Sequence, residues 1–382
     1  MRFNWNALNY LFKALCMIAS TFMVVYWIIE YRKNEDSTVV EVKDIKTMED
    51  AILPEVTVFV VNPFIEEKLV EANAEVNASQ YLKYLTGTVD GNEGYRNISY
   101  EDVTIDLFEY LDSYRISWKS STPKNKAPST TTCAATQKCP YVLFKNNLNA
   151  VFYGSYIFKG FGIELARSTA RLVKNLKLTF RSSLRNLIGT FNTVNVMIHY
   201  PQQILHKTTL NAKPIWTNVN ETSGLISVVV KALEIQKKRN TQKHPCRDDW
   251  MHFDELVLKE HIEKVGCRAP YQKPQKDYPL CDSKLKMRES VFEVTEAGED
   301  SLVPCEELSQ YSFQLNKYNS SEDPTLDPSA LYLKIQYPTS IKVITQSRLI
   351  GIHALIGYIG GYVGLFLGMK LIIQLYIYLR TN

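Results

Sequence analysis

The chain has 382 residues, of which 45% are apolar and 22% charged, an ordinary balance for a protein with one large domain or two modest ones. Its net charge is only +4, and the basic residues form no stripe with interleaved aromatics, which argues against a nucleic-acid partner. No G-x-S-x-G, H-E-x-x-H, P-loop or dinucleotide-binding motif is present, so we expect neither an enzyme nor a cofactor site.

The first predicted element is an apolar helix at residues 11–31, after a short N-terminal segment, residues 1–10. Its main part, residues 14–31, reads ALCMIASTFMVVYWIIEY, close to the length that crosses the hydrocarbon core of a bilayer. A cleaved signal peptide is the alternative, because basic residues precede the run and small residues occur within it. The run from Val24 to Ile29 continues past any plausible cleavage point, which favours a transmembrane helix.

The region between the two apolar segments, residues 32–348, contains several predicted β-strands. A charged connector at residues 32–50 precedes LPEVTVFVVNPF, residues 53–64, whose alternating valines and final proline indicate a strand. Residues 120–132 are rich in Ser, Thr, Pro and Lys and predict a loop. Further strands are expected at Leu172–Phe180, Val194–His199, Leu225–Val230 and Leu331–Gln336.

Cysteines and glycosylation sequons indicate that this region is extracellular. It holds an even number of cysteines, which are candidates for disulfides in an open connectivity: Cys133, Cys139, Cys246, Cys267, Cys281 and Cys305. The first two of these are close enough in sequence to bond to each other. Sequons for N-glycosylation occur at Asn77, Asn97, Asn220 and Asn319. We therefore expect a plasma-membrane protein with this domain outside and both short termini in the cytosol.

One helix is predicted in this region, from about Asp249 to Val265, with apolar residues at helical spacing and Gly266 after its end. It lies between two cysteines, so we expect disulfides to tie its ends to neighbouring segments. A zinc site of Cys246, His252, His261 and Cys267 is the alternative. The spacing matches no metal signature and the compartment favours oxidation, so no metal site is predicted.

The second apolar segment, residues 349–379, reads LIGIHALIGYIGGYVGLFLGMKLIIQLYIYL and is followed by a C-terminal end at residues 380–382. One helix of this length would extend for about 46 Å, which exceeds the hydrocarbon core. We expect it to tilt strongly, to project from the bilayer or to be interrupted at its glycines.

Two features inside this second segment carry information about function. Gly360, Gly364 and Gly368 repeat every four residues and share one helix face, which permits either close helix packing or a narrow pore lined by backbone. Lys370 lies within the apolar run, where a charge is costly unless it faces water or a partner, or snorkels to the interface.

Four stretches, in this order, resemble the degenerin and epithelial sodium channel family, which includes the acid-sensing channels. LPEVTVFVVNPF is similar to the family's strand after the first span, and YLKIQYPTSIKVITQ, residues 332–346, to the strand before the second. GCRAPYQKPQKDYPLC, residues 266–281, resembles its cysteine-rich thumb segment. GYIGGYVGLFLGMK, residues 357–370, is the most specific, because it resembles the pore motif I-G-G-x-x-G-L-F-L-G-x-S.

The resemblance implies two transmembrane helices that flank a large disulfide-bonded α+β ectodomain, with a strand-rich palm-like core and a helical thumb at about residues 246–305. It implies a homo- or heterotrimer in the lipid bilayer, with a sodium-preferring, amiloride-sensitive pore for monovalent cations lined by the second spans. By the same resemblance, Gly368, Met369 and Lys370 form the selectivity filter. The pore helix and gate would contain Gly357, Gly360, Gly361 and Gly364.

The sequence also departs from the family's pattern. Lys370 occupies the position of the filter serine, Tyr358 and Tyr376 occupy positions of acidic residues, and the N-terminal His-Gly motif is absent. In a homotrimer, at about 6 Å and an effective dielectric near 20, each lysine would oppose a cation by about 2 to 3 kcal/mol. We therefore predict a subunit that works in heteromers or conducts poorly alone.

Two other functions stay open at this point. A non-conducting surface receptor or adhesion protein would retain the scaffold without the current. A single-span receptor with a cleaved leader is the weaker reading.

Overall fold

The computed structural model describes residues 5–33, 35–44, 54–120, 130–135, 142–152, 156–165, 171–184, 194–199, 214–215, 217, 223–241, 244–246, 262–272, 278–292, 305–319, 327 and 329–381. The chain divides into two compact units. The first comprises Met1–Val39 and Thr345–Asn382, and the second comprises Val40–Ile344.

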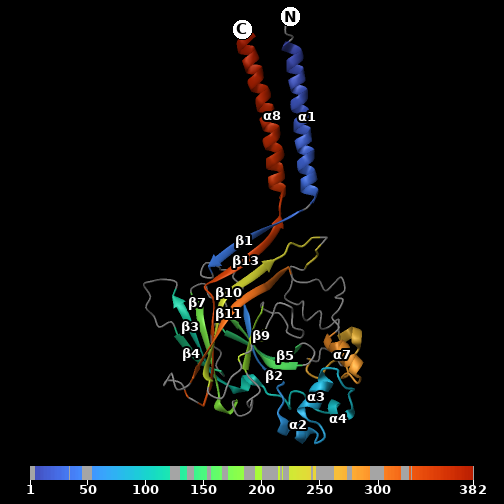
Figure 1. The fold of residues 1–382 in the computed structure, drawn as a ribbon, viewed down its shortest axis with the longest axis vertical. Helices are drawn as coiled ribbons and strands as arrows, with labels where there is room; N and C mark the ends of the chain where they lie inside the picture. Colours follow the sequence, from blue (N-terminus) through green and yellow to red (C-terminus); the bar gives the residue numbers. More distant parts are fainter. Residues whose placement is uncertain are drawn as a thin grey trace. The chain divides into compact units, whose positions relative to one another are not determined.

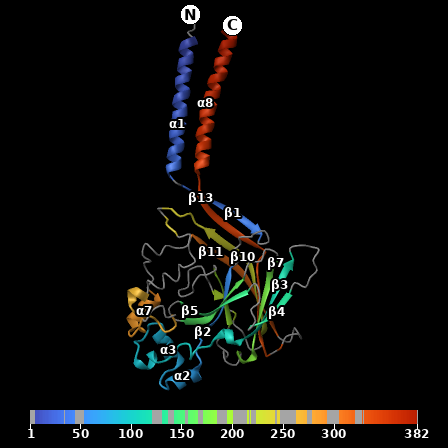
Figure 2. The same ribbon diagram turned by 180° about the vertical axis from the view of Figure 1, so that it is seen from behind.

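The first unit is a pair of long helices, α1 (Trp5–Lys33) and α8 (Ile352–Thr381), together with the ends of the strands joined to them. The two helices lie side by side in both views, with the chain termini at the same end of the pair (Figures 1 and 2). Within α1, Tyr10–Lys33 is long and apolar enough to cross a membrane. It alone passes this test among the described residues, and Ile352–Phe366 of α8 forms a shorter apolar stretch.

The helix α8 continues over 30 residues, which excludes one of the three alternatives for this segment, an interruption at the glycines. A glycine in a helix costs backbone entropy but keeps its N–H donor, so the ladder of hydrogen bonds stays complete. Proline, which would remove a donor, is absent from this segment. The helix therefore extends for about 45 Å.

The larger sheet has eight strands in the order β1-β13-β10-β12-β7-β3-β4, with β11 paired to β10. Pairing is antiparallel between β10 and β11, whereas β10 and β12 run parallel. The strands are β1 (Asp36–Asp44), β3 (Leu111–Ser120), β4 (Thr130–Ala134), β7 (Arg171–Phe180), β10 (Ser223–Lys237), β11 (Glu306–Asn319), β12 (Leu331–Gln336) and β13 (Ser340–Arg348).

A second sheet of five strands has the order β5-β6-β2-β8-β9. Its strands are β2 (Glu55–Val61), β5 (Val142–Phe152), β6 (Tyr156–Leu165), β8 (Val194–His199) and β9 (Pro214–Ile215). The alternating side chains of β2 explain its central place. Val56, Val58 and Val60 enter the main core on one face, while Phe59 packs with Phe158 and Met197 on the other. With both faces covered, the strand is apolar at nearly every position.

Most predicted strands are confirmed with small changes of boundary. Val194–His199 and Leu331–Gln336 have the bounds expected, Leu172–Phe180 begins one residue earlier, and Leu225–Val230 is part of the longer β10. The predicted charged connector was wrong in part, because β1 forms within it. Its sequence DSTVVEVKD is rich in β-branched residues, and an edge strand tolerates charges because its side chains stay exposed.

Short helices that the sequence analysis did not predict form a separate core. They are α2 (Glu66–Ala72), α3 (Ala78–Leu85), α4 (Glu93–Arg96) and α7 (Lys284–Phe292). The 3-10 turn η2 (Leu107–Tyr110), which was also not predicted, packs on the main core instead. Tyr81, Tyr84 and Leu85 of α3 pack with Met287 of α7 and with the residues around Cys267 and Cys281. Of the helix predicted at Asp249–Val265, only residues 262–265 lie within the described part, and they are helical.

Candidate functional site

The helices α1 and α8 pack through one face of α8. Trp27 of α1 stacks on Tyr358 of α8, with ring centroids 4.2 Å apart and an interplanar angle of 16°. Leu355 is buried, and Ile359, Tyr362 and Phe366 are half-buried along the same side of the helix. These positions follow the helical period, so they form one stripe toward α1.

The glycines of α8 lie on the opposite face. Gly357, Gly360, Gly361 and Gly364 are exposed, and no described atom lies within 4 Å of the position that a Cβ would take at any of them or at Gly368. At 3.6 residues per turn, this stripe lies about half a turn away from the stripe that packs on α1. The glycines therefore do not serve the contact between α1 and α8.

This arrangement bears directly on the predicted pore residues. It brings the predicted gate glycines and Gly368 to a single open face, as their spacing suggested. The side chains of Met369 and Lys370 lie outside the described residues, so the predicted filter stays untested. Among the described residues, no part of the chain packs on the glycine face, so the face is open to another chain, to lipid or to a pore.

A second site joins the two helices where the strands begin, and the sequence analysis missed it. The Arg348 guanidinium lies 3.4 Å from the centroid of the Tyr31 ring and donates a hydrogen bond to the Tyr31 carbonyl. The Leu349 amide donates to the Glu35 carbonyl at 2.9 Å, and the hydroxyls of Ser37 and Ser347 are 3.0 Å apart. We call this group the Arg348 clamp. It places a charge-assisted hydrogen bond on a carbonyl at the C-terminal end of α1.

Replacing Arg348 with methionine is expected to lower the stability of the purified full chain by about 2 kcal/mol, since it removes a cation–π contact and a charge-assisted hydrogen bond. Arg348→Lys should lower the stability less than Arg348→Met but should not reach that of the wild type, because an ammonium cannot stack as a planar guanidinium does. The measurement is thermal unfolding in detergent micelles, with the exposed Arg32→Met as matched control. Equal unfolding temperatures for the two methionine variants would contradict the clamp.

The disulfides agree with the expected oxidised state of the domain. Cys246 bonds to Cys305 and Cys267 bonds to Cys281. The first bond joins the two ends of the predicted thumb-like segment. The two disulfides together also exclude the zinc alternative, because Cys246 and Cys267 each bond to another cysteine. Cys133 is disulfide-bonded as well, while Cys139 lies outside the described residues, so their mutual pairing stays a prediction.

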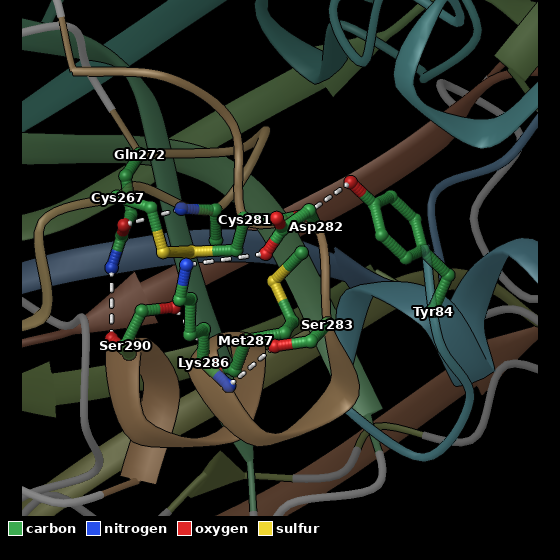
Figure 3. The surroundings of a disulfide bond; sticks show 10 residues. Tyr84, Cys267, Gln272, Cys281, Asp282, Ser283, Lys286, Met287 and Ser290 are labelled. Atoms are coloured by element: carbon green, nitrogen blue, oxygen red, sulfur yellow. Dashed lines mark hydrogen bonds and ion pairs between the residues drawn. A yellow bond between two sulfur atoms is a disulfide. The ribbon is translucent and has the colours of Figure 1, made fainter. Parts of the chain in front are cut away.

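The Cys267–Cys281 disulfide is the centre of a tightly bonded cluster (Figure 3). The buried Gln272 side chain accepts a hydrogen bond from the Ala269 amide at 2.7 Å and donates one to the Ser290 carbonyl of α7 at 3.1 Å. Tyr84 of α3 donates to the Cys281 carbonyl at 3.2 Å, and burial raises the pKa of Tyr84 to about 12. The disulfide loop is thus fixed to two helices.

The glycosylation candidates differ in what the structure shows of them. Asn77 and Asn97 are exposed, as an acceptor asparagine must be. The Asn77 oxygen caps α3 by accepting a hydrogen bond from the Gln80 amide, which leaves its amide nitrogen for a glycan. Asn319 is the last residue of β11, and Asn220 lies outside the described residues.

Comparison with known proteins adds little. No protein-family model matches the chain, and no curated protein matches it either. Among solved structures, the chain is similar to a proton-activated chloride channel determined by cryo-electron microscopy, with 10% identity over 99% of each chain and a TM-score of 0.28. A score this low carries no argument about the fold or function of the chain.

Proposed function

We propose that the chain is a subunit of a trimeric, sodium-preferring cation channel, in which the α8 helices of three chains surround the pore. One observation carries this proposal: the glycine face of α8 is open and lies opposite the face that packs on α1. A pore-lining helix needs such an arrangement, because one face must be anchored and the other must bring backbone close to ions or to neighbouring helices. The sequence resemblance of residues 357–370 to a channel motif adds to it.

The proposed topology places the strand-rich domain outside the cell and both termini in the cytosol. The two disulfides and the exposed sequon asparagines support an extracellular domain. The side-by-side helices, with both termini at one end of the pair, are consistent with two spans and cytosolic ends (Figure 1). Amiloride sensitivity is part of the proposal and rests on the resemblance alone.

The lysine at position 370 defines how the channel would work. A ring of three such charges opposes cations, so we propose that the subunit conducts poorly alone or joins subunits with a serine there. The continuous helix α8 offers a second way to avoid this repulsion, because it determines on which side of the helix position 370 lies. Position 370 is two residues after Gly368, and therefore about 200° further around a regular helix. If the glycine face lines the pore, position 370 falls outside the lining and Lys370→Ser should leave the current unchanged, so the effect of this substitution distinguishes the two arrangements.

Current recordings from oocytes test the proposal. The wild type alone should give little current, and Lys370→Ser should raise the cation current at least about tenfold, the factor expected if 1.4 kcal/mol of repulsion is removed. Lys370→Arg is the matched control and should stay silent. Biotinylation verifies that each variant reaches the surface, and an ion-substitution series with amiloride measures selectivity and block.

The channel proposal is wrong if the wild type and its Lys370 variants reach the cell surface but neither yield a current nor alter the current of co-expressed related subunits. The alternative, a non-conducting surface receptor or adhesion protein, is favoured by the lysine in the filter position. It predicts that ligand binding or cell contact by the ectodomain is unchanged by every substitution in α8.

A further inference from the structure

The strand-rich unit contains a cavity of about 430 Å³ that none of the preceding functions uses. It lies between the segment that follows α4 and the loop closed by the Cys267–Cys281 disulfide. Its volume falls within the range of sites that hold small molecules in proteins. The residues that line it are Arg96, Asn97, Ile98, Ser99, Tyr100, Glu101, Arg268, Pro270, Tyr271, Gln272 and Leu280.

Part of the lining is apolar and firmly packed. Ile98, Tyr100 and Tyr271 are at most 5% exposed, and the two tyrosine rings are 6.0 Å apart in an edge-to-face arrangement. Burial raises the pKa of Tyr100 and Tyr271 above the ordinary phenol value. Both rings are therefore neutral at physiological pH and suit the apolar body of a ligand.

Arg268 brings a positive charge to the cavity from a rigid backbone. Its amide donates to the Pro279 carbonyl at 3.0 Å, and its carbonyl accepts from the Cys281 amide at 3.1 Å, so the residue is held on both sides within the disulfide loop. The guanidinium makes one long hydrogen bond, from Nη1 to the Gln272 carbonyl at 3.4 Å. Its Nε is buried and has no hydrogen-bond partner among the described residues. Such a donor is costly unless a ligand or water accepts from it.

The acidic residue of the cavity is already engaged. Glu101 forms an ion pair of 2.5 Å with Lys159, which is 2% exposed and also donates to the Thr104 hydroxyl at 2.9 Å. The Glu101 carboxylate is thus held at one side by a buried cation. The two arginines have no carboxylate partner of this kind among the described ion pairs of the cavity, which leaves the site electropositive.

We propose that this cavity binds a small organic monoanion with an apolar, aromatic-sized body, and that Arg268 and Arg96 bind its carboxylate. The two guanidiniums supply planar donor pairs that match a carboxylate, and the tyrosine and leucine side chains cover the rest of the molecule. The proposal does not depend on conduction by α8, because it concerns residues of the strand-rich unit only.

One lining residue affects how the site must be tested. Asn97 belongs to a sequon, so a glycan attached there would begin at the rim of the cavity. Ser99→Ala removes the sequon and keeps the asparagine, and it changes a lining hydroxyl to which the proposal gives no role. We therefore choose the full chain with Ser99→Ala as the reference protein, purified in detergent micelles.

Isothermal titration with N-acetylphenylalanine as the probe tests the site, and N-acetylphenylalaninamide is its neutral counterpart. We expect the acid to bind with a submillimolar Kd and the amide at least about tenfold more weakly, as the loss of one charge-assisted contact implies. Arg268→Gln and Arg96→Gln should each weaken binding of the acid at least about tenfold, while the exposed Arg181→Gln should not.

Equal affinity for acid and amide, unchanged binding by Arg268→Gln, or no binding of the acid at millimolar concentration would overturn the proposal. Thermal unfolding verifies that each variant is folded. If Arg268→Gln unfolds, Arg96→Gln decides, because the Arg96 side chain is exposed and forms no hydrogen bond or ion pair with the described residues. A failure of this experiment leaves the channel proposal untouched, and the reverse is also true.

Discussion

Gly160→Ala is expected to destabilise the smaller sheet strongly. Gly160 lies in β6, between β5 and β2, where it pairs with Leu148 and Phe59. A Cβ at this position would lie 2.1 Å from the Val58 carbonyl oxygen and 2.7 Å from the Phe59 Cα. These are backbone atoms of a fully buried strand, so no side chain can rotate to relieve the clash.

We expect a loss of at least about 3 kcal/mol, the upper range for overpacked cores, and retention of most of the protein inside the cell. The measurements are thermal unfolding of the purified chain and the surface fraction by biotinylation. Gly351→Ala is the matched control, because a Cβ there meets no described atom within 4 Å. An unchanged unfolding temperature in Gly160→Ala would show that β6 and β2 are further apart than the structure has them.

Removing the Cys246–Cys305 disulfide is expected to cost more than removing Cys267–Cys281. The first closes a loop with a sequence separation of 59 and the second one of 14. The chain-entropy model gives about 4 kcal/mol for the longer loop and about 3 kcal/mol for the shorter. This disulfide also joins the start of β11 to the segment after β10, where the Lys238 amide donates to the Cys305 carbonyl at 2.6 Å.

The comparison requires double serine variants, so that no unpaired thiol remains. Unfolding temperatures should fall in the order wild type, Cys267→Ser with Cys281→Ser, Cys246→Ser with Cys305→Ser. Cys16→Ser is the control, because this cysteine is free and should have no effect. The reverse order, or no effect of either pair, would contradict the entropic account.

The parts of the fold that the sequence predicted well are those where one side-chain pattern covers a whole element. The valines of β2 and the apolar run of β8 read directly as strands, because both are buried along their length. The edge strand β1 was missed because its exposed charges resemble a linker. The helix α7 was missed because only Met287 and Ser290 are buried among its described side chains, at residues 284–290, so they form no apolar stripe.

The candidate site was predictable in part. The spacing of the glycines predicted that they share a face of α8, but nothing in their spacing could show which side of the helix packs on α1. That depends on the stacking of Trp27 on Tyr358, which are far apart in the sequence. The Arg348 clamp depends in the same way on a contact across 317 positions. The cavity could not be predicted either, because two distant loops form its walls.

The cap of α3 gives Asn77 two tasks, since its oxygen serves the helix and its nitrogen is the atom that would carry a sugar. The customary Asn→Gln exchange used to map occupied sequons would then remove a structural hydrogen bond worth about 1 kcal/mol together with the carbohydrate. Poor trafficking of such a variant would say nothing about glycosylation. Ser79→Ala abolishes the sequon and keeps the cap, so at this position the third residue of the triplet is the one to change.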